Sequence, residues 1–158
     1  MANKLFSSKT VQRMDVNFAT TPITAGSYIT VGQLPANVII TDGWAVIKTE
    51  LGDADAGDDT TMSIGYTGAA AALYAATALT AMDAGVYLKL LPGVINIVAA
   101  QAITTVDTPE EAVSIARASA DTFTGKVLTA TKDIILTAGA GQNINDGTMS
   151  IFLEYLKY

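Results

Sequence analysis

Short runs of alternating apolar and polar residues, separated by clusters of Gly, Pro, Asn and Asp, make up most of the chain. Residues 28–66 show this pattern most clearly, in three runs at 28–31, 38–51 and 60–66 that are rich in β-branched and aromatic residues. Pro35 and Asn37 separate the first run from the second. Such runs are typical of short strands joined by turns, so we expect three strands here.

The second of these runs indicates how its strand faces solvent. Side chains alternate between the two faces of a strand, so Lys48 and Glu50 fall on the same side as Trp44 and Val46. That side changes from apolar to charged along its length. We therefore expect one face of this strand to meet water near its end.

The same pattern predicts strands in the rest of the chain, at residues 14–18, 86–91, 126–130, 133–138 and 148–158, with one or two more within 94–106. In the last strand Met149, Ile151, Leu153 and Tyr155 share one face with Lys157, and we expect this face to lie on the core. The Gly/Asn-rich residues 139–147 before it predict a flexible loop. Gly139-Ala140-Gly141 in that loop belongs to no phosphate-binding motif.

Two segments favour helices. Residues 69–82 are rich in Ala and contain no Gly or Pro, which predicts a short helix packed over one end of the strands. Thr108-Pro109-Glu110-Glu111 combines a capping residue, a proline suited to the first helical position and an acid three residues after the cap. This predicts a helix to about Ser119, and helix capping explains Glu110 and Glu111 better than acid–base catalysis does.

Together these elements predict a mainly β fold, an antiparallel β-sandwich of jelly-roll type with one or two short helices. A chain of 158 residues is expected to form one such domain, over residues 14–158, and to bury roughly 70% of its unfolded surface. Residues 1–13 are polar and aperiodic apart from Leu5 and Phe6, so they are expected to form an N-terminal arm.

Composition narrows the possible chemistry. The chain has no Cys and no His, which excludes disulfides, thiolate catalysis, His-based triads and the commonest metal ligands. The net charge of -6, with only nine scattered basic residues, argues against nucleic acid as a partner. No segment approaches the ~20 consecutive apolar residues that a membrane-spanning helix needs. We expect no enzymatic activity, no catalytic residue, no metal site and no cofactor.

An acidic turn at residues 52–59 is the one candidate for a metal site. Its Asp53, Asp55, Asp58 and Asp59 resemble the start of an EF-hand calcium loop, but the position of the bidentate Glu falls on Ile64. A solvated hairpin loop, binding calcium only weakly if at all, is the favoured interpretation. A hydrolase that uses two of these carboxylates ranks lowest, because catalysis needs rigidly held groups.

Several stretches resemble a known family. They are Leu34-Pro35-Ala36-Asn37-Val38-Ile39-Ile40-Thr41-Asp42-Gly43 at the entry to a long strand, Ser63-Ile64-Gly65-Tyr66, the Ala-rich segment after it, and the ending with Gly147-Thr148-Met149-Ser150-Ile151-Phe152. Over most of residues 14–158 the chain resembles the small β-sandwich virion structural proteins of tailed bacteriophages, of the capsid decoration (cement) or head-fibre type. The helix expected at 109–119 departs from that pattern.

The resemblance implies a function and partners. It implies a capsid decoration or cement protein on the virion surface, made in the host cytoplasm, that binds the major capsid protein and itself as a homotrimer, without nucleic acid or membrane. The alternative is a minor virion component, such as a head-fibre, tail or receptor- or carbohydrate-binding module. Trp44 favours the first reading, because it lies in a strand rather than in a loop.

Two groups of residues are candidate contacts with partners. Lys4, Leu5, Phe6, Lys9 and Arg13 in the arm are candidate capsid contacts, although the arm could equally pack on its own domain. Tyr66, Tyr74, Tyr87 and Tyr158 are candidate interface anchors, with ordinary core or edge packing as the alternative for each.

Overall fold

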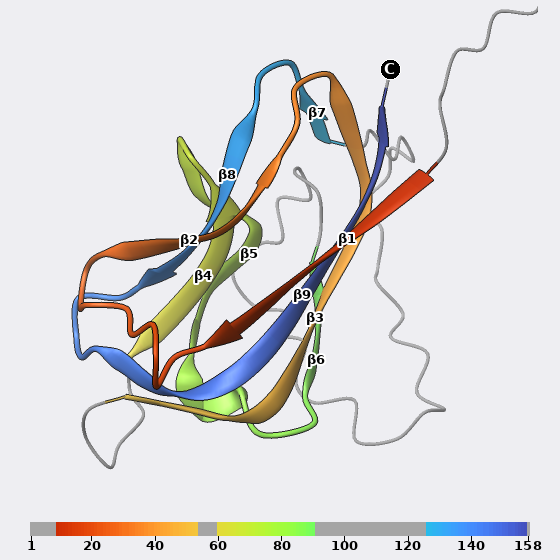
Figure 1. Ribbon diagram of the computed structural model, residues 1–158. Helices are drawn as coiled ribbons and strands as arrows, with labels where there is room; N and C mark the ends of the chain where they lie inside the picture. Colours follow the sequence, from red (N-terminus) through yellow and green to blue (C-terminus); the bar gives the residue numbers. More distant parts are fainter. Residues whose placement is uncertain (1–8, 54–59, 91–125, 158) are drawn as a thin grey trace, which may run out of the picture.

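The computed structural model describes residues 9–53, 60–90 and 126–157 (Figure 1). These residues form β1 (Lys9–Asn17), β2 (Tyr28–Leu34), β3 (Val38–Asp53), β4 (Thr61–Tyr66), β5 (Ala69–Ala78), the 3-10 turn η1 (Leu79–Ala81), β6 (Tyr87–Leu90), β7 (Lys126–Leu128), β8 (Lys132–Ala138) and β9 (Ile144–Lys157). Every strand pairing among them is antiparallel.

The strands form two sheets that pack face to face, so the predicted antiparallel β-sandwich is confirmed (Figure 1). Sheet A has the order β1-β9-β3-β6, and β7 pairs with the first residues of β3 beside β6. Sheet B has the order β2-β8-β4-β5. Consecutive strands often lie in different sheets, which makes most of the pairings long-range in sequence.

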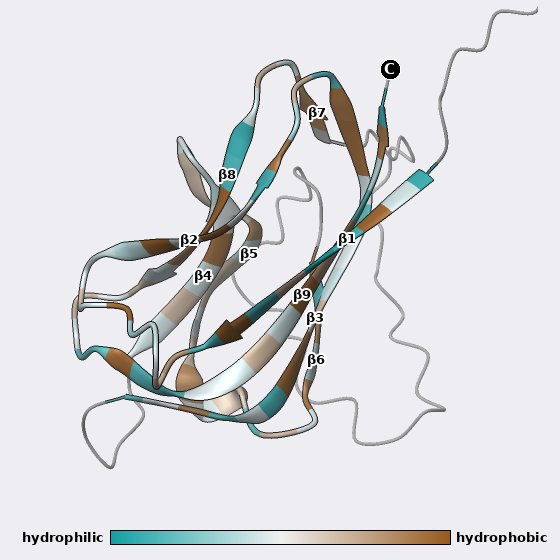
Figure 2. Cartoon of the chain, viewed as in Figure 1, coloured by the Kyte–Doolittle hydropathy of each residue, from teal (hydrophilic) through white to brown (hydrophobic). Residues whose placement is uncertain are grey.

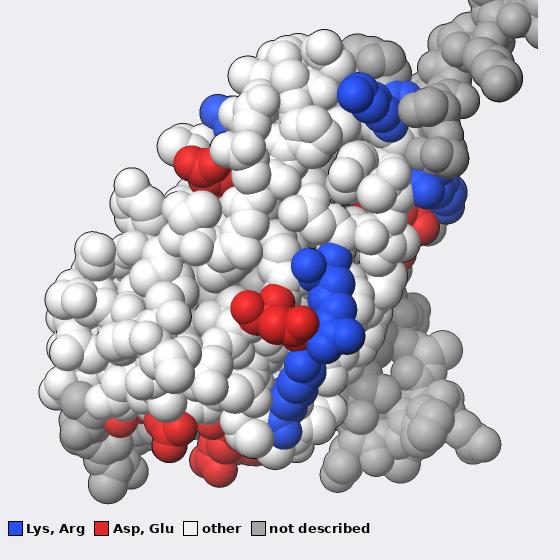
Figure 3. Space-filling model, viewed as in Figure 1, with Lys and Arg blue, Asp and Glu red and all other residues white. Residues whose placement is uncertain are grey.

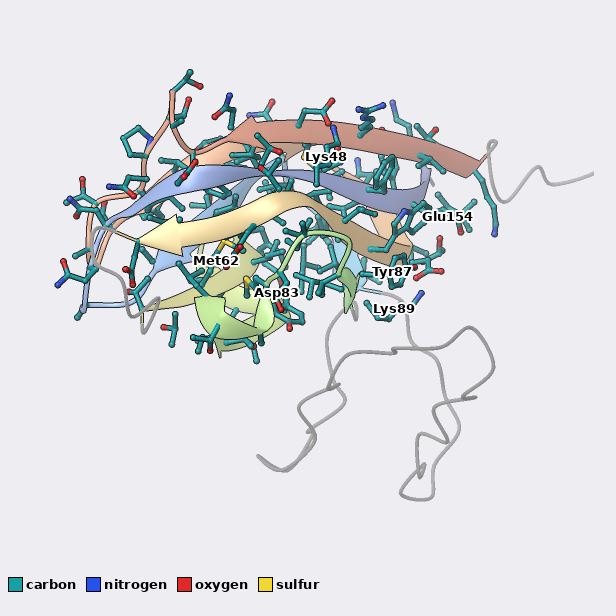
Figure 4. The ribbon with its side chains drawn as sticks, turned by 90° about the horizontal axis from the view of Figure 1, so that it is seen from below. Lys48, Met62, Asp83, Tyr87, Lys89 and Glu154 are labelled. Carbon is teal, nitrogen blue, oxygen red and sulfur yellow. The ribbon has the colours of Figure 1, made fainter. Side chains whose placement is uncertain are left out.

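Alternation along the strands fills the space between the sheets. In β9 the side chains of Met149, Ile151 and Leu153 are fully buried, as the sequence pattern predicts. Sheet B supplies Met62, Ile64, Ile134 and Leu136 from the opposite side, all fully buried. Figure 2 shows apolar residues recurring along the strands of both sheets, and Met62 lies between the sheets in Figure 4. At roughly 25 cal/mol per Å² of apolar surface, this core is the main source of the fold's stability.

The expected helix at 69–82 is wrong. Residues 69–78 form strand β5, paired with β4, and only Leu79–Ala81 form a 3-10 turn. Alanine favours helices by only a few tenths of a kcal/mol per residue, and tertiary pairing outweighs that preference. Here Leu73 and Leu79 are buried in the core, and Tyr66-Thr67-Gly68-Ala69 turns the chain back on β4, with Gly68 at φ +94°.

Other differences concern strand ends and connections. The acidic turn is not a hairpin loop, because β3 and β4 lie in different sheets. Strand β9 begins at Ile144, inside the segment expected to be a loop. Strand β1 begins at Lys9, within the expected arm, and pairs with β9 over its whole length. The strands expected within 94–106 and the helix at 108–119 lie outside the described residues.

Candidate interaction surface on sheet A

Sheet A contains most of the charged residues of the described strands. We define the outer face of sheet A by the strand positions on the side away from sheet B, where Ser150 is the one buried residue: Val11, Arg13, Asp15, Ile39, Trp44, Val46, Lys48, Tyr87, Lys89, Val127, Ser150, Phe152, Glu154 and Leu156. By contrast, the four strands of sheet B contain only Lys132 and Asp133 as charged residues. Figure 3 shows acidic and basic side chains adjacent over β1 and β9, and a largely uncharged surface over β2.

An aromatic pair lies at the centre of this face. Strand pairing places Trp44 of β3 directly opposite Phe152 of β9, which in turn lies opposite Arg13 of β1. The rings of Trp44 and Phe152 stack with centroids 5.2 Å apart and an interplanar angle of 11°. The Arg13 guanidinium lies 5.8 Å from the centre of the Phe152 ring. Such stacked and cation–π contacts hold the side chains in fixed positions before any partner binds.

The Asp15 carboxylate accepts bonds from three donors beside the aromatic pair. The Arg13 guanidinium (Nε–Oδ2, 3.0 Å) and Lys48 Nζ (2.9 Å to Oδ1) form ion pairs with Asp15, and the Ser150 hydroxyl donates a hydrogen bond to it. The bonds from Ser150, Lys48 and Arg13 hold the pKa of Asp15 well below its usual range. The carboxylate therefore stays ionised far into the acid range, and it fixes two cations on the face.

Glu154 and Asp42 form two further ion pairs at the other end of the sheet. Lys9 Nζ lies 2.9 Å from Glu154, and the Thr41 hydroxyl donates to the same carboxylate at 2.7 Å. These bonds from Lys9 and Thr41 lower the pKa of Glu154. Lys89 donates to Asp42. Figure 4 shows Glu154 and Lys89 toward the same end of the molecule. Each of the three acids on this part of sheet A thus has a basic partner.

Apolar side chains complete the surface. Val11, Tyr87 and Val127 are 52%, 54% and 50% exposed. Val11 lies on β1, Tyr87 opposite Val46, and Val127 opposite Ile39, so they surround the aromatic pair. Trp, Tyr and Arg are enriched at protein–protein interfaces, and this surface carries all three, so it is a candidate interaction surface.

Some of the predicted contact residues lie on this surface, and others lie in the core or outside the described residues. Lys9 and Arg13 lie on β1 and belong to the ion pairs above, whereas Lys4, Leu5 and Phe6 lie outside the described residues. Tyr87 is exposed on the outer face of sheet A. Tyr66 is buried in the core with Lys132 Nζ 5.9 Å from its ring centre, Tyr74 is half-buried, and Tyr158 lies outside the described residues.

Sequence reasoning missed the residues that bind this surface together. It placed Trp44, Val46 and Lys48 on one face of their strand and Phe152, Glu154 and Leu156 on the noncore face of theirs. It did not pair the two strands. Asp15 and Ser150 are 135 positions apart, and only the β1–β9 register brings them together.

The described residues provide no metal site. No group of three or more Asp and Glu side chains among them could hold a metal ion. Asp53, the described carboxylate of the acidic turn, instead accepts a hydrogen bond from the Thr60 backbone N–H at 3.1 Å. The rest of the acidic turn, for which the sequence predicts weak calcium binding at most, lies at residues 54–59, outside the described residues.

No helix in the described part of the chain is long and apolar enough to cross a membrane.

Comparison with solved structures reveals three similar chains. One belongs to the capsid of Ralstonia phage GP4, with a TM-score of 0.57 and 16% identity over 100% of this chain and 90% of that one. Another belongs to the capsid asymmetric unit of cyanophage Pam1, with a TM-score of 0.57 and 16% identity over 100% and 91%. A chain of the acidic stable capsid structure of Helicobacter pylori bacteriophage KHP30 has a TM-score of 0.52 and 12% identity over 96% and 89%.

The chain shares its fold with phage capsid proteins. The match spans almost the whole of both chains, so the matched proteins are close to this one in length. Neither a scan against protein-family models nor a search of curated proteins finds a match.

Proposed function

We propose that this chain is a non-enzymatic structural protein of a bacteriophage virion, and that it decorates or cements the capsid by binding the major capsid protein. The observation that supports this most strongly is the full-length similarity to chains of three phage capsid structures.

The outer face of sheet A is the surface that we assign to the shell. Its aromatic pair and its exposed Val11, Tyr87 and Val127 offer apolar surface that a partner can bury. Asp15 and Glu154 already form ion pairs with basic residues of this chain. Burying this face against a partner would therefore desolvate few unpaired charges. Burying this face across the boundary between shell subunits would raise the free energy needed to separate them.

Lys9 and Arg13 are two residues of the predicted arm that form ion pairs at this same surface. Both lie on β1, which is the edge strand of sheet A, and both form ion pairs with acids of the outer face. The residues that precede Lys9 in sequence are therefore joined to a strand that contributes to the proposed contact. This supports the arm residues Lys4, Leu5 and Phe6 as further contacts with the shell.

Binding to shells that lack this protein tests the proposal. Purified chain is mixed with such shells, the shells are sedimented, and the bound chain is measured. We expect saturable binding that Tyr87→Ser weakens by about tenfold or more, the loss expected for one interface anchor. Tyr28→Ser is the matched control, because Tyr28 is 58% exposed on sheet B. No binding by the unmodified chain, or equal loss for both variants, would contradict the assignment.

A further inference from the structure

The Asp15 cluster on the outer face of sheet A, defined as Arg13, Asp15 and Lys48, contains two cations and one carboxylate. Both cations form ion pairs with Asp15, and neither forms one with any other acid among the described residues. The bonds to Asp15 keep its carboxylate ionised. The cluster therefore carries one positive charge in excess, although the whole chain has a net charge of -6.

The other ion pairs of this face are balanced. Lys9 Nζ lies 2.9 Å from Glu154, and Lys89 donates to Asp42, so each of these cations has an acid of its own. Either pair can be covered by an uncharged surface without leaving a net charge behind. The Asp15 cluster cannot, and it is therefore the point on the face where the charge of a partner matters most.

Both cations of the cluster keep hydrogen-bond donors for a partner. The Arg13 guanidinium donates from Nε and Nη2 to Asp15 Oδ1, at 3.1 and 3.0 Å, and Lys48 Nζ contacts the same oxygen at 2.9 Å. A guanidinium has five N–H donors and an ammonium three, so each group has further donors that bond to no described residue. Because both groups contact one oxygen, they lie close enough together for a second carboxylate to bind both.

The cluster lies next to the aromatic pair, within the area that a partner would cover. Lys48 on β3 reaches Asp15 on β1 across β9, which lies between these two strands. The Arg13 guanidinium lies 5.8 Å from the centre of the Phe152 ring. Figure 3 shows basic side chains beside an acidic group over β1 and β9. A partner that covers Phe152 would therefore remove water from the excess charge as well.

We propose that the shell protein places an aspartate or glutamate side chain against Arg13 and Lys48, so that two carboxylates balance the two cations. Burying an unpaired charge is strongly unfavourable, and a partner carboxylate removes that penalty. This inference rests on the proposed function and adds the chemistry of the partner at one point of the contact. Charge-assisted hydrogen bonds from both cations would fix the orientation of the chain on the shell.

Neutralising Lys48 has opposite effects with and without a partner acid. In Lys48→Gln the remaining Arg13–Asp15 pair is balanced, so a shell carboxylate would lose its counter-charge and binding should weaken by about tenfold or more. Against a shell surface without an acid, the same substitution would remove an unpaired charge, and binding would be unchanged or tighter. The affinity is measured by sedimentation with shells that lack this protein.

Lys132→Gln on sheet B is the matched control. Its ammonium donates to the Thr67 carbonyl at 3.0 Å, away from the outer face of sheet A, so its loss should leave shell binding unchanged. Circular dichroism establishes that both variants are folded. Unchanged or tighter binding by Lys48→Gln would overturn this inference alone. No binding by the unmodified chain would overturn the proposed function, and this inference with it.

Carbodiimide crosslinking gives a second, independent readout. A water-soluble carbodiimide joins a lysine amine to a carboxylate as an amide and takes up the water that is lost. Shells with the unmodified chain bound should yield a peptide in which Lys48 is joined to an Asp or Glu of the shell protein, identified by mass spectrometry. Lys48→Gln should lose this peptide. Crosslinks to the shell protein that are identical for the two chains would overturn the inference.

Discussion

Trp44 and Phe152 stack across neighbouring strands of sheet A, with ring centroids 5.2 Å apart, on the side of the sheet that faces away from the core. Large aromatic residues on an outward face bury much less surface than those in the core. Their stacking therefore contributes to stability while leaving apolar surface available to a partner.

A double-mutant cycle measures this stacking. Trp44→Leu, Phe152→Leu and the double variant should show a coupling of about 0.5–1.5 kcal/mol in the free energy of unfolding, determined in urea. Trp44→Leu combined with Tyr28→Leu is the control. These two residues lie in different sheets, so their effects should add. A coupling near zero for Trp44 and Phe152 would show that the stacking is not energetically significant.

The Asp15 network should make stability depend on pH. The native pKa of Asp15 lies below the ordinary value of 3.8, so the contribution of the ionised group is complete above that value and is lost as the pH falls through the native pKa. At neutral pH, Asp15→Asn should lower the free energy of unfolding by about 1 kcal/mol, since solvent weakens these partly exposed bonds. The difference between the two proteins should shrink in strong acid. The account would be contradicted if the difference in unfolding free energy between the two proteins were equal at neutral and strongly acidic pH. Glu50→Gln on β3 serves as the control.

Ser150 is the largest single cause of the lowered pKa of Asp15. Ser150→Ala removes the hydroxyl that donates to the carboxylate, so the pKa of Asp15 should rise toward its ordinary value. A carboxyl carbon titration by NMR measures this. Ser63→Ala is the control, because its hydroxyl donates instead to the Ala70 carbonyl in sheet B and should leave Asp15 unchanged.

Gly65 should tolerate no side chain. A Cβ at this position would lie 2.2 Å from the Ala69 carbonyl oxygen and 2.4 Å from the Ala70 carbonyl carbon, both backbone atoms of β5. Gly65→Ala should therefore force β5 away from β4 and cost more than ~2 kcal/mol of unfolding free energy. Gly141→Ala should cost much less, because its nearest neighbour would be the Thr60 hydroxyl at 3.4 Å. Similar melting temperatures for the two variants would refute the predicted crowding.

The sequence predicted those features that depend on local alternation. The strands around Tyr28, Trp44 and Ile134 and the core face of β9 follow from period-two patterns, which report directly on burial. The Ala-rich strand β5 was not predicted, because alanine favours helices weakly and its pairing with β4 outweighs that preference. The outer face of sheet A was missed for a similar reason: the β1–β9 and β3–β9 registers cannot be read from one sequence.

The copy number of this protein in purified virus particles tests the central claim most directly. Quantitative mass spectrometry gives its ratio to the most abundant shell protein. A decoration or cement protein should be present in numbers comparable to the shell protein, because it binds a repeated site on the shell. A few copies per particle would instead indicate a fibre, tail or vertex component, and absence from the particles would contradict a role in the virion.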